Sequence, residues 1–494
     1  MILVNRQNIA SHPEFLLGFN PLLEGLSPFI PYLEINERFR HYPLQGIEWR
    51  ELPPARRTPL LALAAHHFVP TSDALRITDA IQTLIRYHLV LRNPLQNNEQ
   101  VRINRIALIR SLKELGAVVI LDGSGILLSG ITGLGKTHIV KRALSLVAPN
   151  QVIVHDRSAV CGWARLDQIV YLHITFPSNG SRGALLLRLC QAVDDLLGTT
   201  YLDHYRSEQR RVRNLDNGLA MVCSILSSHR VAAVVIDESQ SENLEQSPWG
   251  DELRLCFLNL LNIGVGVILL GNPSAFQNIR ISSQLERRFS TGGIFELRPS
   301  LRNQKKSDWP GFSRGMHEFQ LVDDVQIDPG VRSKFEGDNT AGIAGLLRIL
   351  HVEGQRQCLR RGESRAVMEI EDLEDALGSP AFVGAARIVS SISRITGHPD
   401  FADLDVVGEE NAPVGPGHQA TAGPDGKPFV PAEVPDVIRQ TLANDRRRDT
   451  LARNKALKAQ LLLATLPMED ERMEGVKEAH IQSARDAIAR QSSK

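Results

Sequence analysis

The sequence lacks the features that mark membrane, secreted or zinc-binding proteins. No run of apolar residues approaches the roughly 20 that span a bilayer, and the first ten residues contain no basic stretch followed by an apolar one. The five cysteines are scattered, none lies in a Cys-x-x-Cys pair and none precedes Cys161, which argues against a zinc module in the N-terminal part. We therefore expect a cytoplasmic protein with reduced, buried thiols and no contact with a membrane.

An excess of one charge is also missing. The chain carries 56 lysines and arginines against 56 acidic residues. Proteins that coat nucleic acid are usually basic, so any DNA contact must depend on local groups of cations. With 494 residues the chain exceeds the roughly 250–300 that one hydrophobic core supports, and we expect two or three domains.

Short apolar segments alternate with amphipathic ones in the middle of the chain. The segments expected to form strands are 125–129, 170–176, 231–236, 265–270 and 293–297. The helices expected between them are 137–147, 184–197, 216–228 and 251–262. Two further helices, 72–91 and 101–115, precede the first strand. This alternation predicts an α/β fold in which helices cover both faces of a parallel five-stranded sheet.

A glycine-rich loop connects the first predicted strand to its helix. From Gly130 to Thr137 it reads GITGLGKT, a complete match to the Gly-x4-Gly-Lys-Ser/Thr motif in its strand–loop–helix context. Glycines let backbone N–H groups approach phosphate oxygens, and the helix N-terminus adds the positive end of its dipole. Lys136 is expected to reach the β- and γ-phosphates and Thr137 to bind Mg²⁺. The residues expected to contact ATP are Gly130, Thr132, Gly133, Gly135, Lys136, Thr137 and His138.

Polar residues follow two later strands of the predicted core, 231–236 and 265–270. Asp237 and Glu238 end the strand 231–236, and Asn272 follows the strand 265–270. Ligands bind at this carboxyl edge of parallel sheets. We expect Asp237 to hold Mg²⁺ through its water shell and Glu238 to act as the general base toward water. Asn272 would sense the γ-phosphate, although an Asn-Pro turn explains it equally simply.

Two arginines, Arg287 and Arg288, lie just before the fifth predicted strand. Arginine neutralises the charge that develops on a transferring phosphoryl group, and a neighbouring subunit can supply it. A solvent-exposed pair of arginines is the alternative.

From about residue 75 to residue 395 the chain resembles the AAA+ ATPase regulators of bacterial DNA transposition, the TnsC/TniB type. The segments that carry the resemblance are Arg92-Asn93-Pro94, the loop GITGLGKT, Phe176-Pro177, Ser181-Arg182, Asp195 to Tyr201, Asp237-Glu238-Ser239-Gln240, Leu269-Leu270-Gly271, Arg287-Arg288, and Trp309 with Phe312. Asn272 stands where the family favours threonine, and the first 70 and last 100 residues have no counterpart.

This resemblance implies an ATP-dependent assembly on double-stranded DNA that connects a target-selector protein to transposase subunits. It further implies a homo-oligomeric ring or helical filament in which an arginine of one subunit completes the nucleotide site of its neighbour. We divide the chain into a mostly helical, partner-binding N-terminal region (1–100), an AAA+ P-loop ATPase core (101–320), a helical lid (321–395), a flexible linker rich in Pro and Gly (396–432) and a helical tail (433–494).

Several basic groups are candidates for contacts with DNA or partners. One candidate is Arg182, at a predicted helix start. The others are two basic runs: Arg206, Arg210 and Arg211, and Arg298, Arg302, Lys305 and Lys306. The tail between residues 436 and 458 carries a net charge of about +4 and a partial leucine stripe, which suggests a peptide that folds on the transposase. Ordinary solvated helix faces explain each run as well.

Two other classes of protein share the nucleotide motifs. A AAA+ helicase loader or DNA-repair ATPase has the same ATP-binding residues. A signalling NTPase of the STAND type should carry repeats, and the sequence shows none.

Overall fold

The computed structural model describes residues 11–109, 111–115, 120–178, 180–212, 214–239, 250–272, 276, 283–300, 307–362 and 364–385. The predicted linker and tail lie outside these residues, as do residues 386–395 of the predicted lid and Arg302, Lys305 and Lys306. None of the helices within the described ranges is long and apolar enough to cross a membrane. All five cysteines are buried thiols.

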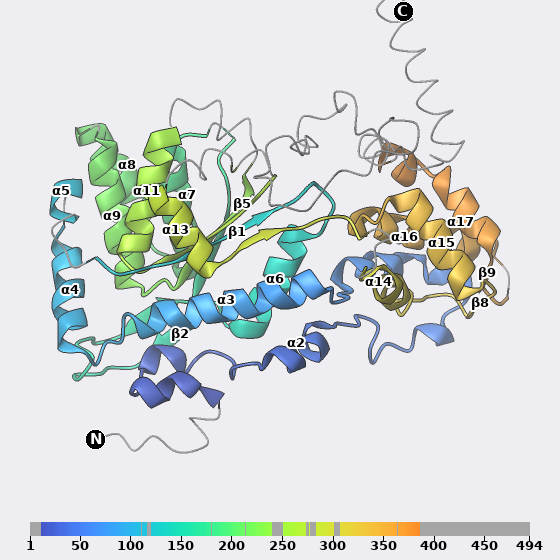
Figure 1. Cartoon of the computed structure of the whole chain (residues 1–494), viewed down its shortest axis with the longest axis horizontal. Coiled ribbons are helices and arrows are strands. Elements are labelled where there is room, and N and C mark those ends of the chain that lie inside the picture. The colour runs from blue at the N-terminus through green and yellow to red at the C-terminus, as the bar shows by residue number, and fades with distance from the viewer. Residues whose placement is uncertain are drawn as a thin grey trace, which may run out of the picture.

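A parallel five-stranded sheet forms the centre of the molecule, as predicted (Figure 1). Its strands are β1 (Gly125–Ser129), β4 (Tyr171–Thr175), β5 (Ala233–Ser239), β6 (Gly266–Gly271) and β7 (Ile294–Glu296). Their order is β4-β5-β6-β1-β7, and every neighbouring pair is parallel. Because β6 lies between β1 and β5, the ends of these three strands meet at one edge.

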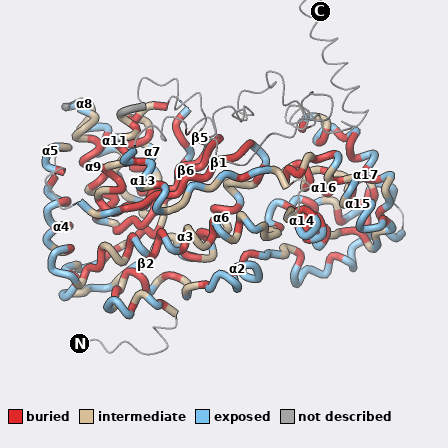
Figure 2. Tube along the Cα trace, in the orientation of Figure 1, coloured by how far each residue is buried: buried red, intermediate tan, exposed pale blue. Residues whose placement is uncertain are grey.

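The two faces of the sheet bury separate sets of side chains. Leu127 belongs to one hydrophobic cluster, while its neighbours Ile126 and Leu128 belong to the other, as the period of two in a strand requires. The helices on the first face are α7 (Arg182–Leu197), α9 (Leu215–Ser228), α11 (Gly250–Asn262) and α13 (Ser283–Gly292). Those on the second are α3 (Ser72–Val90) and α6 (Lys136–Val147). Figure 2 shows the sheet buried between these layers.

Some elements were absent from the sequence-based prediction. An antiparallel pair, β2 (Val152–His155) and β3 (Leu166–Ile169), follows α6, and α8 (Tyr201–Val212) follows α7. The helix predicted over 101–115 is two helices, α4 (Asn97–Leu108) and α5 (Leu112–Leu115). Thr71 caps α3 by accepting a hydrogen bond from the Ala74 N–H, which fixes where that helix begins.

The helices that follow the sheet are α14 (Trp309–Met316), which lies within the stretch predicted as ATPase core, and α15 (Pro329–Thr340), α16 (Ala344–Arg360) and α17 (Ile370–Leu377), which lie within the predicted lid. We refer to these four helices as the lid. Two short parallel strands, β8 (Asp324–Val325) and β9 (Val367–Met368), join its loops. The lid core also includes Leu44, Trp49 and Leu61 from the N-terminal segment.

Residues 11–70 therefore belong to two cores. Short elements η1 (Pro13–Leu17), η2 (Pro21–Leu23) and α2 (Tyr32–Phe39) pack on the second face of the sheet. Elements η3 (Trp49–Glu51), η4 (Pro54–Arg56) and η5 (Thr58–His66) pack with the lid. In Figure 1 the blue N-terminal chain runs below the sheet and reaches the lid. The segment thus connects the ATPase core to the lid by a second route.

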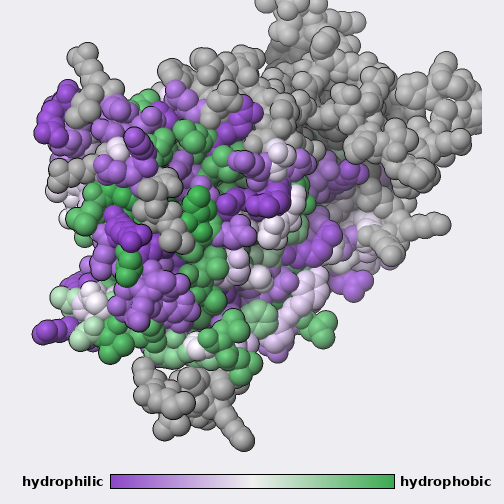
Figure 3. All heavy atoms as spheres, turned by 60° about the vertical axis from the view of Figure 1, so that its left-hand side comes forward, coloured by the Kyte–Doolittle hydropathy of each residue, from purple (hydrophilic) through white to green (hydrophobic). Residues whose placement is uncertain are grey.

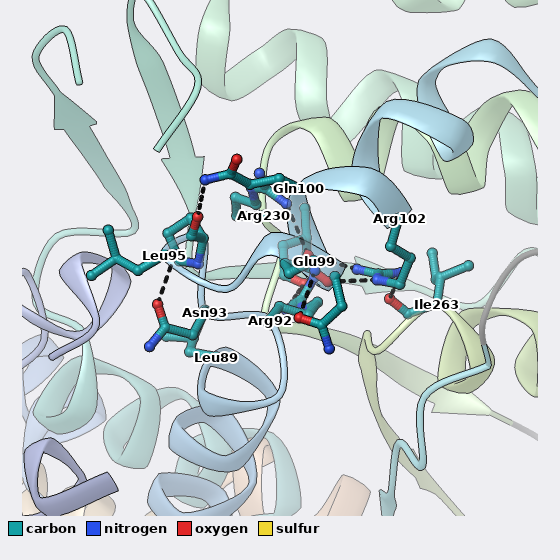
Figure 4. A network of polar contacts seen from close by, with 12 residues as sticks. Leu89, Arg92, Asn93, Leu95, Glu99, Gln100, Arg102, Arg230 and Ile263 are labelled. Atoms are coloured by element: carbon teal, nitrogen blue, oxygen red, sulfur yellow. Dashed lines mark hydrogen bonds and ion pairs between the residues drawn. The ribbon is translucent and has the colours of Figure 1, made fainter. Parts of the chain in front are cut away.

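A buried polar network holds α3 and α4 to the amino end of the sheet, far from the glycine-rich loop (Figure 4). Arg102 Nε and Nη2 donate to the two oxygens of Glu99 at 2.6 and 2.8 Å, and Arg230 Nη1 donates to the same carboxylate at 3.1 Å. Arg92 Nη2 donates to the Val231 carbonyl at 2.8 Å. These charged side chains are almost completely buried. Such pairing is what makes buried charge tolerable.

Candidate nucleotide-binding site

The loop between β1 and α6 is folded for anion binding. Gly133 and Gly135 have φ angles of 90° and 87°, in the left-handed region that favours glycine. A side chain at Gly133 would also approach Ile343 of the lid to 3.0 Å. Lys136 Nζ lies inside the loop, where it donates to the carbonyls of Gly130 and Ile131 at 2.5 and 3.1 Å. The loop thus surrounds a cation at the start of a helix.

Two of the predicted polar residues lie opposite this loop. Asp237 and Asn272 are 6% and 5% exposed, and both line the same cavity as Lys136 and Thr137. The pairing of β5 with β6 shifts between Ile236 and Ser239, so the strand is irregular where Asp237 and Glu238 occur. Such irregularities re-aim side chains beside active sites. Glu238 belongs to β5, but its side chain lies outside the described part of the structure.

The cavity has a volume of about 480 Å³, which is within the range of small-molecule sites. The loop and α6 form one wall, with Thr132 to Ile139, and the carboxyl ends of β5 and β6 form the second. The third wall is apolar and comes from the N-terminal segment and the lid: Phe39, Phe68, Val69, Phe312 and Met316. A phosphate-binding loop beside an aromatic wall suits a ligand with a polyphosphate and a flat ring.

The apolar wall is fastened to α6. His41 and Phe68 exchange two backbone hydrogen bonds as an isolated antiparallel bridge, at 3.2 and 3.1 Å. Arg142 of α6 donates from Nε to the Phe39 carbonyl at 3.0 Å and stacks 5.7 Å from the Phe68 ring centroid. Burial lowers the pKa of Arg142 below its ordinary value. The helix that follows the glycine-rich loop therefore also positions the aromatic wall.

Sequence reasoning missed Arg348, which lies on α16 and lines the cavity from the lid side. Its Nη1 is 3.5 Å from Nε2 of His138, and the His138 ring lies 6.3 Å from the ring of Phe68. The lid, the P-loop helix and the N-terminal segment meet at these three side chains. No local pattern marks Arg348, because the same helix also carries Arg356 and Arg360.

The structure does not bring Arg287 or Arg288 to this cavity in the same subunit. Arg288 donates from Nη1 to the Gly123 carbonyl at 2.8 Å and from Nη2 to the Asn262 amide oxygen at 2.9 Å. Gly123 precedes β1, so Arg288 lies near the amino end of the sheet and braces its own subunit. Arg287 is exposed on the same helix, α13. Of the two, Arg287 has the free reach that a finger for a neighbouring subunit needs.

The residues predicted to contact DNA also fall into two groups: Arg182 is buried, whereas the arginines of α8 are exposed. Arg182 is 6% exposed and forms ion pairs with Asp216 at 3.0 Å and Glu252 at 3.4 Å. It therefore connects α7, α9 and α11, and reaching DNA would break both pairs. Arg206, Arg210 and Arg211 are exposed on α8, where Arg206 and Arg211 contact Asp203 and Glu208 of the same helix. Figure 3 turns this end of the molecule forward and shows a largely hydrophilic surface in its upper part.

Residues 120–279 match a family model described as an AAA domain. No curated protein matches the chain. One similar solved structure is the ORC2 protein of Aeropyrum pernix in ADPNP and ADP complexes, at 14% identity over 62% of this chain and 76% of that one, with a TM-score of 0.36. Another is the Aeropyrum pernix ORC1 protein in complex with DNA, at 17% identity over 62% and 72%, with a TM-score of 0.34. A third is Cdc6p from Pyrobaculum aerophilum, at 12% identity over 61% and 74%, with a TM-score of 0.35.

Proposed function

We propose that this chain, whose residues 120–279 form an AAA-type P-loop ATPase domain, binds ATP with Mg²⁺ in the 480 Å³ cavity and hydrolyses it. The observation that carries the proposal is the convergence of Lys136, Thr137, Asp237, Asn272 and Arg348 on one cavity with an aromatic wall. Mg²⁺ usually binds one or two carboxylates together with substrate phosphates. The Thr137 hydroxyl and the Asp237 carboxylate supply a donor set of that kind.

Each residue then has a distinct part in hydrolysis. The loop N–H groups and Lys136 bind the β- and γ-phosphates, and the aromatic wall receives the base. Mg²⁺ would neutralise charge on the phosphate oxygens. Glu238 accepts a proton from the attacking water, while Asn272 orients that water. Arg348 reaches the phosphates from the lid, so its contact is made only when the lid is closed.

The finer proposal is an ATP-dependent switch in DNA transposition, which assembles on double-stranded DNA and connects target selection to transposase recruitment. It is supported by the sequence segments shared with the TnsC/TniB type and by the exposed arginines of α8. In this proposal ATP binding orders the subunits on DNA, and hydrolysis ends that state.

Two variants test the ATPase. Lys136→Ala removes the phosphate-binding cation, so calorimetry should detect no ATP binding. Glu238→Gln keeps the shape but cannot accept a proton, so it should bind ATP and lose on the order of 10²–10⁴ in turnover. Unchanged ATP affinity of Lys136→Ala contradicts the site, and normal turnover by Glu238→Gln contradicts the general-base role.

The transposition proposal needs its own measurement. Glu238→Gln should form long-lived oligomers on duplex DNA in electron micrographs when ATP is present, and Lys136→Ala should form none. The transposase encoded beside the gene should bind these DNA-bound oligomers more tightly than the free protein. An ATPase that never assembles on DNA, or whose gene has no transposase gene beside it, would exclude this role while leaving ATP hydrolysis intact.

A further inference from the structure

A histidine on the edge strand lies against the carboxylate expected to hold Mg²⁺. His173 is in the middle of β4, and its Nε2 is 3.3 Å from Oδ2 of Asp237. The register explains the contact, because Thr175 of β4 pairs with Asp237 of β5 and His173 pairs with Val235. Residues two apart on a strand share a face, so His173 lies on the same side of the sheet as Asp237 and can reach it diagonally.

The other residues of β4 show that His173 is not there to fill the core. Leu172 and Ile174 point to the opposite face and are buried in its hydrophobic cluster. His173 lines a second cavity of about 390 Å³, together with Lys141, Tyr171 and Asp195. Its ring nitrogen Nε2 contacts Asp237, which lines the nucleotide cavity. The His173 side chain thus makes a polar contact beside an open cavity and is not packed into a hydrophobic cluster.

We propose that His173 is a positioning residue that orients the Asp237 carboxylate toward Mg²⁺. A carboxylate that binds a cation or its water with one oxygen is free to rotate unless the other oxygen is held. A ring N–H donated to that second oxygen fixes the rotation and keeps a lone pair directed at the ion. Partners of this kind behind a metal ligand change metal affinity by about 10–100-fold when they are removed.

The backbone at Asp237 is held independently of its side chain, because the Asp237 carbonyl accepts the Phe176 N–H at 2.7 Å. Thr175, which pairs with Asp237 in the ladder, is exposed at the strand end. Replacing His173 should therefore remove a contact from the carboxylate and leave the strand in place.

This inference rests on the proposed ATP site, and the experiment distinguishes a failure of the His173 role from a failure of the ATP site itself. A fluorescent ATP analogue is bound to the full-length protein, first with EDTA and then during a Mg²⁺ titration. His173→Leu removes the donor at similar size and should raise the Mg²⁺ midpoint by about 10–100-fold, with unchanged affinity in EDTA. His173→Gln keeps an N–H donor at a similar reach and should stay close to the wild-type midpoint. Tyr171→Phe is the matched control, because it lines the second cavity without touching Asp237.

A wild-type midpoint for His173→Leu, or an equal shift for His173→Gln, overturns the role of His173. Equal binding of the analogue by wild type and Lys136→Ala would overturn the ATP site itself. If His173→Leu does not fold, His173→Asn replaces it, because the shorter amide cannot reach Asp237. A shift with Asn and none with Gln then supports the proposal, and equal midpoints contradict it.

Discussion

Burial controls the protonation of His88, a residue of α3 at the amino end of the sheet. Its Nδ1 donates to the Gly264 carbonyl at 2.8 Å, and its Nε2 accepts the Ser124 N–H at 3.1 Å, a pattern that fits the neutral ring. Burial is the main reason that the pKa of His88 falls from 6.5 to about 4, with the charge of Arg92 adding to the effect. Between pH 6.5 and pH 4, His88 is therefore protonated in the unfolded chain and neutral in the folded protein.

We predict that His88 makes the protein less stable in mild acid. Its contribution is fully present above pH 6.5 and is lost as the pH falls toward 4, by about 3 kcal/mol. Urea unfolding of wild type and His88→Gln between pH 7 and pH 4 measures this, since Gln cannot titrate. The difference in unfolding free energy between the two proteins should shrink on acidification. Parallel curves would show that His88 binds its proton equally well in the folded and unfolded states.

The sequence indicated the position of some site residues and missed that of others. The loop from Gly130 to Thr137 was readable because its chemistry depends on neighbours in the chain. Arg182 and Arg288 were not, because only the fold shows that both are held by partners distant in the sequence. Arg348 and His173 reach the site from the lid and the edge strand, and no local pattern indicates that approach. The catalytic and DNA-binding roles remain predictions.

Among the elements, α8 is the best candidate for contact with phosphates, since three arginines are exposed along it. Each phosphate contact that is lost should lower the slope of log K against log salt by roughly 0.9 on duplex DNA. We predict a flatter slope for the Arg206, Arg210, Arg211 triple glutamine variant and similarly weakened binding on all sequences. Filter binding over a salt series, with a non-hydrolysable ATP analogue, measures it.

The control for α8 is a pair of arginines equally exposed elsewhere, Arg165 and Arg365, at 66% and 67%. Their double glutamine variant should keep the wild-type slope. Replacing Arg182 should instead lower the unfolding temperature, because Asp216 and Glu252 lose their partner. If the triple variant retains the wild-type slope, α8 is not part of the DNA interface.

The sequence predicted the continuously apolar strands better than the elements without a clear hydrophobic period. The apolar strands β1, β5 and β6 stand out because both faces of the sheet are covered, which leaves a continuous hydrophobic run. β2 and β3 have four residues each, and Val154 is exposed, so neither shows a clear period. The 3₁₀ elements η4 and η5 each have a proline at one of their first two positions, and Trp49 of η3 and Leu61 of η5 are buried in the lid core, which the sequence of that segment does not reveal.

At the scale of the whole molecule, the proposed nucleotide cavity lies where three parts of the chain meet: the sheet with its helices, the lid and the N-terminal segment that crosses between them. Phe39 and Phe68 of that segment are themselves part of the cavity wall. A nucleotide bound at this junction would bias the angle between core and lid, and so the surface that each subunit offers to the next. We therefore expect residues 11–70 to be able to transmit the state of a bound nucleotide to a partner.

This arrangement leads to a prediction about the assembled protein. The described residues bring no arginine of α13 to the subunit's own cavity, whereas Arg287 is exposed and Arg288 is held at the amino end of the sheet. If Arg287 completes a neighbour's site, Arg287→Ala and Lys136→Ala subunits should each be inactive alone and regain activity when mixed on DNA. In a random equal mixture roughly a quarter of the interfaces pair an intact loop with an intact Arg287, which sets the expected recovery. ATPase assays across mixing ratios, with DNA-bound oligomers verified by electron microscopy, provide the measurement.

Arg288→Ala serves as the contrast, because it should lower the unfolding temperature of isolated subunits, which Arg287→Ala should not. Mixed oligomers that assemble yet remain inactive at every ratio would exclude Arg287 as the shared residue.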